Sequence, residues 1–284
     1  MNRPSGDSLL NLLPPFTREA LEELYGRWNR RRFVHPDPLE FLYGFSRSSD
    51  REIVGLIASC LAYGRVSQIL GSVSKVLDVL GPSPSEFVLG KDLREFRELL
   101  AGFRHRFTTG DDLSKLLVGI RKALDRYGSL EDVFLDALEH TDGNFCSALT
   151  IFARRLKRSP EGNVPVPSPE KGSACKRLNL FLRWMVRCDE VDPGGWFRIQ
   201  PSRLMVPLDT HMHRIALRMG LTRRLQADWR TAREVTEAFA SLVPEDPVRY
   251  DFVLTRLGIW ASNGMDKMGD VGEDLRESAA SDRA

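Results

Sequence analysis

The chain has 284 residues and a net charge of +2, and it contains no run of the roughly 20 apolar residues that a membrane-spanning helix requires. Hydrophobic residues make up 42% and charged residues 28% of the chain, which is the composition of a soluble globular protein. The apolar patch at the N-terminus lacks a signal-peptide cleavage pattern, so we expect a cytoplasmic protein that does not contact a membrane.

Helical periodicity dominates the first half of the chain. Apolar residues recur at Ile53, Ile57 and Leu61, four positions apart, which is typical of the buried stripe of a helix. Gly81 and Pro82 are a strong helix stop. On such patterns we predict helices over residues 16–33, 51–63, 66–80, 111–127, 130–138 and 144–156.

Residues 158–169 contain four prolines, which cannot lie inside a helix, so we expect this segment to cross between two lobes. Helical patterns resume over residues 170–187, 210–219, 229–242 and 247–258, and no run alternates as a strand would. Residues 264–284 are polar and are expected to be disordered. They carry a net charge of −3, which leaves a net charge of +5 on the rest of the chain. The prediction is an all-α fold with two lobes, 1–157 and 170–263, and an active-site cleft between them.

Metal sites are not expected. The four cysteines, Cys60, Cys146, Cys175 and Cys188, are too far apart for a zinc finger or an iron–sulfur cluster. His211 and His213 are two positions apart on a predicted helix and point in nearly opposite directions, so one ion cannot bind both. The sequence indicates no metal and no cofactor.

Two segments contain the candidate catalytic residues. In Val206-Pro-Leu-Asp209-Thr-His, an apolar run brings Asp209 to the start of a helix, where the simplest role for an aspartate is a structural N-cap worth ~1 kcal/mol. Residues 171–187 are apolar on one side and basic elsewhere, with no acidic residue among them. Lys176 lies in this helix, where a lysine is ordinarily a solvated surface residue.

The segment VPLDTH, followed by an arginine-bearing amphipathic helix, resembles the element of helix-hairpin-helix DNA glycosylases that carries their catalytic aspartate. Residues 52–79 resemble the early helical pair of that superfamily. GSACKRLNLFLRWMVR, VPLDTH and DPVRYDFVLTRLGI resemble the marks of a bacterial family known only as a domain of unknown function, over the chain up to about Trp260. Among characterised proteins, the closest resemblance is to archaeal-type 8-oxoguanine glycosylases, whose catalytic lysine lies some thirty residues before the aspartate, as Lys176 precedes Asp209.

The resemblance implies a DNA-repair glycosylase that acts as a monomer, without a cofactor, on double-stranded DNA containing a damaged base. Lys176 would be the nucleophile, Asp209 would stabilise the cationic sugar, and an imine would give the enzyme AP-lyase activity. An oxidised base such as 8-oxoguanine is the expected substrate. Tyr63 and Arg65, in the turn of the early helical pair, would fill the gap left by the extruded base.

The pocket for the extruded base would include residues near the end of the folded region, namely Asp251, Phe252 and Trp260. The alternatives are core packing for the two aromatic residues and a surface charge for Asp251.

The usual LPGVG-like hairpin of the superfamily is missing. We therefore expect the hairpin to run through residues 191–196, with Gly194 and Gly195 letting backbone N–H groups approach a phosphate. The other expected phosphate contacts are Arg177, Arg183, His211, Arg214 and Arg218.

Three other functions remain open. The same scaffold could bind damaged DNA without cutting it. It could be a glycosylase without lyase activity, in which Asp209 activates water and Lys176 contacts a phosphate. It could also be a helical interaction scaffold unrelated to DNA. If Lys176 is not the nucleophile, Lys171 is the next candidate.

Overall fold

The computed structural model describes residues 13–157 and 164–263. Within them the protein is almost entirely helical, which confirms the all-α prediction, and the strands are two short ones, β1 (Arg104–His105) and β2 (Thr108–Thr109), paired antiparallel. The α-helices are α1 (Arg18–Trp28), α2 (Ser48–Cys60), α3 (Val66–Leu80), α4 (Pro84–Leu89), α5 (Leu93–Leu99), α6 (Gly110–Tyr127), α7 (Leu130–Glu139), α8 (Phe145–Leu156), α9 (Lys176–Val186), α10 (Thr210–Arg218), α11 (Trp229–Leu242) and α12 (Asp251–Asn263). Short 3₁₀ helices are η2 (Arg31–Phe33), η3 (Pro38–Gly44), η4 (Pro169–Lys171) and η5 (Pro201–Arg203).

The bounds of α3 and α11 are those that the sequence predicts, whereas α1, α2 and α12 differ by several residues from the predicted ranges 16–33, 51–63 and 247–258. Gly81 ends α3 with a φ of 69°, and the Asp228 side chain caps α11 by accepting from the Thr231 N–H group. The helix predicted from residue 170 instead begins at Lys176, because Gly172 and Cys175 both take left-handed backbone conformations. The prediction missed α4, α5 and the β1–β2 hairpin.

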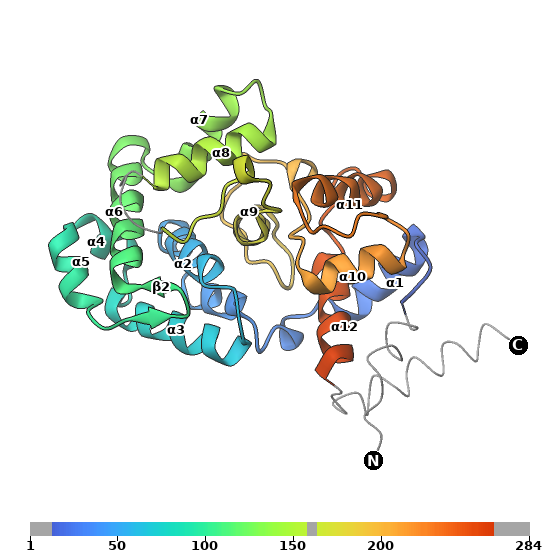
Figure 1. Cartoon of the computed structure of the whole chain (residues 1–284), viewed down its shortest axis with the longest axis horizontal. Coiled ribbons are helices and arrows are strands. Elements are labelled where there is room, and N and C mark those ends of the chain that lie inside the picture. Colours follow the sequence, from blue (N-terminus) through green and yellow to red (C-terminus); the bar gives the residue numbers. More distant parts are fainter. Residues whose placement is uncertain (1–12, 158–163, 264–284) are drawn as a thin grey trace, which may run out of the picture.

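Helix α9 lies at the centre of the molecule, with α2–α8 on one side and α10–α12 on the other (Figure 1). Helix α1 comes from the start of the chain but packs with the last helices. Its Glu22 carboxylate accepts from Arg249 at 2.8 and 2.9 Å and from the Tyr250 hydroxyl at 2.8 Å. The grouping of helices in space therefore differs from the expected division of the sequence, since α1 joins the helices that follow the proline-rich segment.

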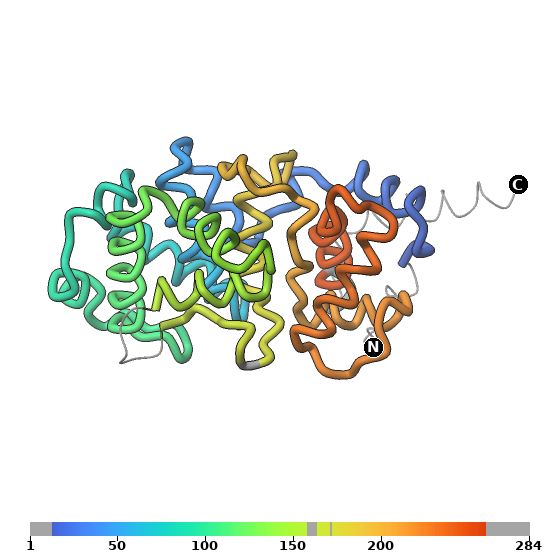
Figure 2. The backbone as a smooth tube through the Cα atoms, turned by 90° about the horizontal axis from the view of Figure 1, so that it is seen from above, coloured from blue at the N-terminus to red at the C-terminus, as the bar shows by residue number. Residues whose placement is uncertain are grey.

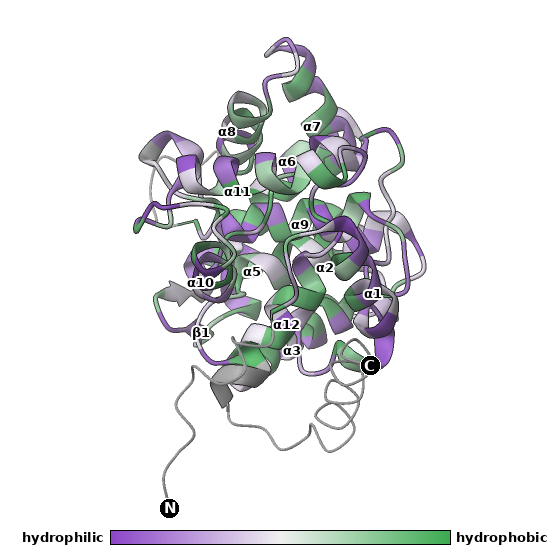
Figure 3. Ribbon diagram, turned by 90° about the vertical axis from the view of Figure 1, so that its right-hand side faces the viewer, coloured by the Kyte–Doolittle hydropathy of each residue, from purple (hydrophilic) through white to green (hydrophobic). Residues whose placement is uncertain are grey.

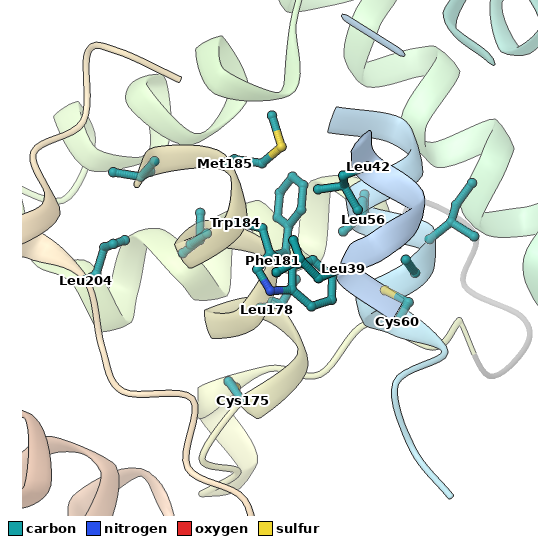
Figure 4. Close-up of a cluster of buried hydrophobic side chains, with 14 of the residues drawn as sticks. Leu39, Leu42, Leu56, Cys60, Cys175, Leu178, Phe181, Trp184, Met185 and Leu204 are labelled. Atoms are coloured by element: carbon teal, nitrogen blue, oxygen red, sulfur yellow. The ribbon is translucent and has the colours of Figure 1, made fainter. Parts of the chain in front are cut away.

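The core is one continuous cluster of buried apolar side chains that includes residues from nearly every helix. Its centre is the apolar face of α9, where Leu178, Phe181 and Met185 are fully buried against α2 and η3 (Figure 4). Gly55 allows this close approach, because a Cβ there would lie 3.3–3.5 Å from Leu42, Phe181 and Met185. Colouring by hydropathy shows that much of α12 is hydrophobic, whereas α1 and α10 also carry hydrophilic residues (Figure 3). This packing fixes the position of α9 and of the residue at its N-terminus.

None of the helices in the described ranges combines the length and apolar composition needed to cross a membrane. Within the same residues, no group of three or more His, Cys, Asp or Glu side chains is arranged to hold a metal ion. The segments 158–163 and 264–284, expected to be part of a crossing and a disordered tail, lie outside the described residues.

Candidate active site

Lys176 and Asp209, 33 positions apart in the sequence, meet in the structure. The Lys176 Nζ atom lies 3.3 Å from the Asp209 Oδ2 atom, which is within ion-pairing distance. Their side chains are 34% and 15% exposed, so the amine is accessible while the carboxylate is mostly covered. Both lie at helix N-termini, where the helix dipole stabilises negative charge. An amine and a carboxylate so placed can act together on one substrate atom.

Lys176 is placed by an unusual turn. Cys175, the residue before it, is buried and has a φ of 50°, a left-handed conformation that non-glycine residues rarely adopt. The Ser173 hydroxyl accepts a hydrogen bond from the Cys175 N–H group at 3.1 Å, which stabilises this conformation. Helix α9 therefore begins abruptly at Lys176, with no side chain capping its N-terminus.

Asp209 is placed by the buried run before it. The Val206 N–H group donates to the Thr236 hydroxyl at 3.0 Å, which ties this run to α11. The Asp209 Oδ1 atom accepts from the Met212 N–H group at 2.8 Å and caps α10. The expected N-cap role is therefore present, but it uses one oxygen only, and the other oxygen faces Lys176.

Behind this pair lies a buried ionic network. Arg183, 4% exposed, pairs with Asp192 at 3.1 Å and also with Asp251. Burial raises the pKa of Asp251 to about 6; Arg183 opposes this effect, and the negative charge of Asp209 adds to it. The Asp251 Oδ1 atom has no hydrogen-bond partner within the described part of the chain. Asp251 is therefore not a surface charge, and Arg183 is too deeply buried and neutralised to contact a phosphate, contrary to the sequence-based expectation.

The loop expected to be a phosphate-binding hairpin has a different role. The Gly194 N–H group donates to the Trp184 carbonyl at 3.1 Å, and the residue is buried. The Gly195 carbonyl accepts from the Ser48 hydroxyl at 2.8 Å, and a Cβ at this position would lie 2.9 Å from that hydroxyl oxygen. These glycines allow the loop to pack tightly against α2 and α9. The Gly194 N–H group is therefore not free to bind DNA, which corrects the prediction for this residue.

Arg177 and Tyr63 also differ from expectation. The Arg177 guanidinium donates to the Cys60 and Pro165 carbonyls, both at 2.9 Å, and its Cζ atom lies 5.2 Å from the centroid of the Tyr63 ring. The Tyr63 hydroxyl bonds to the His105 carbonyl at 2.9 Å and to the Thr108 hydroxyl at 2.6 Å. Arg177 therefore ties α9 to α2 instead of standing free for a phosphate, and Tyr63 is not free to enter a DNA duplex.

The other predicted contacts are variously placed. Arg65 is exposed and lies directly before α3. Arg214 is exposed within α10, and His211 is half-buried. Phe252 is 4% exposed, with the Arg256 guanidinium 5.1 Å from its ring centroid, as expected of a core residue. The side chains of Trp260 and Lys171 lie outside the described residues.

Sequence reasoning missed Asp192 and Thr236. Asp192 is fully buried and bonds both Arg183 and Arg187, while Thr236 positions the segment before Asp209. One feature of the sequence indicates a partner such as Asp192. Arg183 and Arg187 belong to a predicted helix with a large apolar face, and buried arginines require carboxylate partners.

Comparison with known proteins identified one family. A family model described as "Protein of unknown function (DUF2400)" matches residues 37–260. Searches of curated proteins and of solved structures found no match.

Proposed function

Since the chain belongs to the DUF2400 family, whose function is unknown, we propose its function from the site itself: a DNA glycosylase with AP-lyase activity. The observation that carries this proposal is the 3.3 Å approach of the Lys176 amine to the Asp209 carboxylate. The resemblance to helix-hairpin-helix glycosylases pairs the same two residues. The proposed substrate is duplex DNA with an oxidised base of the 8-oxoguanine type, and the protein would act in the cytoplasm as a monomer.

The pair suits the chemistry of base excision. After losing one proton to solvent, the Lys176 amine would attack C1′ of the damaged nucleoside. The bond from C1′ to the base would break as the base leaves with its electron pair and takes up a proton. The Asp209 carboxylate would stabilise the positive charge that develops on the sugar. The bond from C1′ to the ring oxygen then breaks as a proton passes from the Lys176 nitrogen to that oxygen, which gives an imine between Lys176 and the opened sugar. Loss of the C2′ proton from this imine expels the 3′ phosphate.

The surroundings of the pair support access by DNA. The β1–β2 hairpin, the turn before α9 and the loop between α10 and α11 lie along one edge of the molecule, drawn green, yellow and orange (Figure 2). The Trp229 N–H group donates to the Gly172 carbonyl at 3.1 Å, which joins the loop to the turn. We expect DNA affinity to fall steeply with rising salt, because contacts between cationic side chains and phosphates release counterions. An affinity that is insensitive to salt would count against a nucleic-acid partner.

The decisive experiment is borohydride trapping on duplexes that each carry one intact damaged base. The wild-type protein should give a covalent adduct with at least one of them, and Lys176→Gln should abolish it while leaving duplex affinity within a few-fold, since one charge is a small part of a multi-contact surface. The matched control is Lys91→Gln, because Lys91 is 31% exposed and lies 3.0 Å from Glu95 in a comparable ion pair.

Each failure points to a different alternative. Base release without any adduct would indicate attack by water activated by Asp209. Binding without base release would indicate a DNA-binding module. An adduct that survives Lys176→Gln would move the nucleophile to another amine, and Lys171→Gln would then be tested.

A further inference from the structure

The β1–β2 hairpin carries an exposed aromatic ring at its tip. Phe107 is 73% exposed, and the guanidinium of Arg106 lies 5.6 Å from its ring centroid. A single exposed phenylalanine is common on protein surfaces and would not by itself indicate a function. Its setting, however, is both rigid and cationic.

The hairpin is held firmly in place. The His105 side chain is buried, and its ring nitrogens bond to the Ser72 hydroxyl at 2.9 Å and to the Tyr63 carbonyl at 3.0 Å. Gly64 leaves room for the side chain of Arg106, since a Cβ there would lie 2.8 Å from the Arg106 Cδ atom. The ring of Phe107 therefore projects from a braced turn.

A surface cavity of about 370 Å³ lies between this hairpin and α3. Its lining includes the cations Lys75, Arg104 and Arg106 and no acidic residue. All three cations are exposed, and none forms an ion pair with a carboxylate in residues 13–157 and 164–263. Three unneutralised cations around one cavity suit an anion with several oxygen acceptors, such as a phosphodiester.

The hairpin is also linked to the proposed active site. Tyr63 bonds to the hairpin and receives the guanidinium of Arg177 on its ring, and Arg177 is the neighbour of Lys176. The hairpin and the turn before α9 lie along the same edge in Figure 2. A duplex bound along this edge would meet the hairpin beside the nucleotide presented to Lys176.

We propose that the β1–β2 hairpin is the element that enters the DNA duplex, with Phe107 inserted into the base stack and Lys75, Arg104 and Arg106 binding the adjacent phosphates. It takes the place in the duplex that the sequence suggested for Tyr63. An inserted apolar side chain fills the space of an extruded nucleotide and offsets the free energy lost on unstacking. The DNA partner and the identity of that nucleotide rest on the proposed function, whereas insertion itself requires no catalysis.

The test uses a duplex with a tetrahydrofuran abasic analogue next to 2-aminopurine, whose fluorescence rises when it is unstacked and which requires no catalysis. The wild-type protein should raise the fluorescence, and Phe107→Ala should lose most of that rise and bind about tenfold more weakly, in line with the value of aromatic–base stacking. The matched control is Phe197→Ala, since Phe197 is 79% exposed but lies outside the hairpin; it should behave as wild type. Arg104→Gln should reduce the slope of log affinity against log salt concentration by about one, which corresponds to the loss of one phosphate contact.

The inference is overturned if Phe107→Ala matches wild type in fluorescence and affinity, or if wild-type binding leaves the fluorescence unchanged. The outcome is separable from that of the glycosylase proposal. A wild-type protein that unstacks the probe through Phe107 but never excises a base would overturn the glycosylase proposal alone.

Discussion

Glu52 offers a quantitative test of how α2 is joined to the rest of the molecule. Its side chain is 1% exposed, and its two oxygens accept from the Leu130 N–H group and the Trp196 indole N–H group, each at 3.0 Å. Burial raises its pKa from 4.5 to about 7, although both hydrogen bonds oppose the rise. The folded protein therefore holds a proton on Glu52 that the unfolded chain has already released between pH 4.5 and 7.

The expected effect of Glu52→Gln follows from this difference. Because the folded-state pKa is raised, increasing the pH from 4.5 to above 7 should destabilise the wild-type protein through Glu52 by up to roughly 3 kcal/mol, at 1.36 kcal/mol for each tenfold change in proton affinity. The variant cannot lose this proton, so its free energy of unfolding should rise relative to wild type across the same range. Glutamine also loses one acceptor, which lowers its stability at every pH by about 1 kcal/mol.

The measurement is urea unfolding of both proteins at several pH values between 4.5 and 8, monitored by circular dichroism. Glu98→Gln is the control, because Glu98 is exposed on α5 and pairs with Arg94 at 3.0 Å. Its curve should run parallel to that of the wild type. If the free energy of unfolding of Glu52→Gln keeps a constant offset from that of wild type, or falls relative to it as the pH rises, the reasoning is refuted.

Three further predictions concern packing and the site. Gly119→Ala should lower the free energy of unfolding, measured by thermal unfolding, by about 1–3 kcal/mol, because the new Cβ would lie 2.0 Å from the Leu156 carbonyl oxygen. Gly71→Ala, with open space around it, should instead stabilise α3 by about 0.5–1 kcal/mol. Asp209→Ala should lower stability by ~1 kcal/mol through loss of the cap, while Asp209→Asn should keep the cap; if the proposed function is right, both should lose base excision. Asp251→Asn should reduce discrimination between damaged and normal bases more than duplex affinity, and an equal loss of both would assign Asp251 a structural role only.

The helices with local signals were predictable, and the partners of their polar residues were not. Gly81 ends α3 because glycine, which lacks a Cβ, readily takes a positive φ, and Asp228 marks the start of α11 because its side chain caps that helix. The β1–β2 hairpin was missed because strands of two residues are too short to show alternation.

The candidate pair was predicted from a resemblance, whereas its surroundings depend on distant residues. The basic face of α9 suggested a DNA-binding surface, but Arg183 is neutralised by Asp192 and Asp251, which lie 9 and 68 positions further along. The two glycines at 194 and 195 suggested a phosphate-binding turn, since a sequence does not distinguish a glycine that admits a ligand from one that admits a neighbouring helix. Such distinctions require knowledge of the tertiary contacts.

The position of α1 has a consequence for how the protein is made. Its partners Arg249 and Tyr250 follow Glu22 by 227 and 228 positions. At 5–20 residues per second, roughly 10–45 s of translation separate the appearance of α1 from that of the residues it packs against. During that interval Leu21, Leu24 and Trp28, all buried in the folded protein, have no completed surface to cover them. The nascent chain therefore exposes the apolar face of α1 until Arg249 and Tyr250 have left the ribosome.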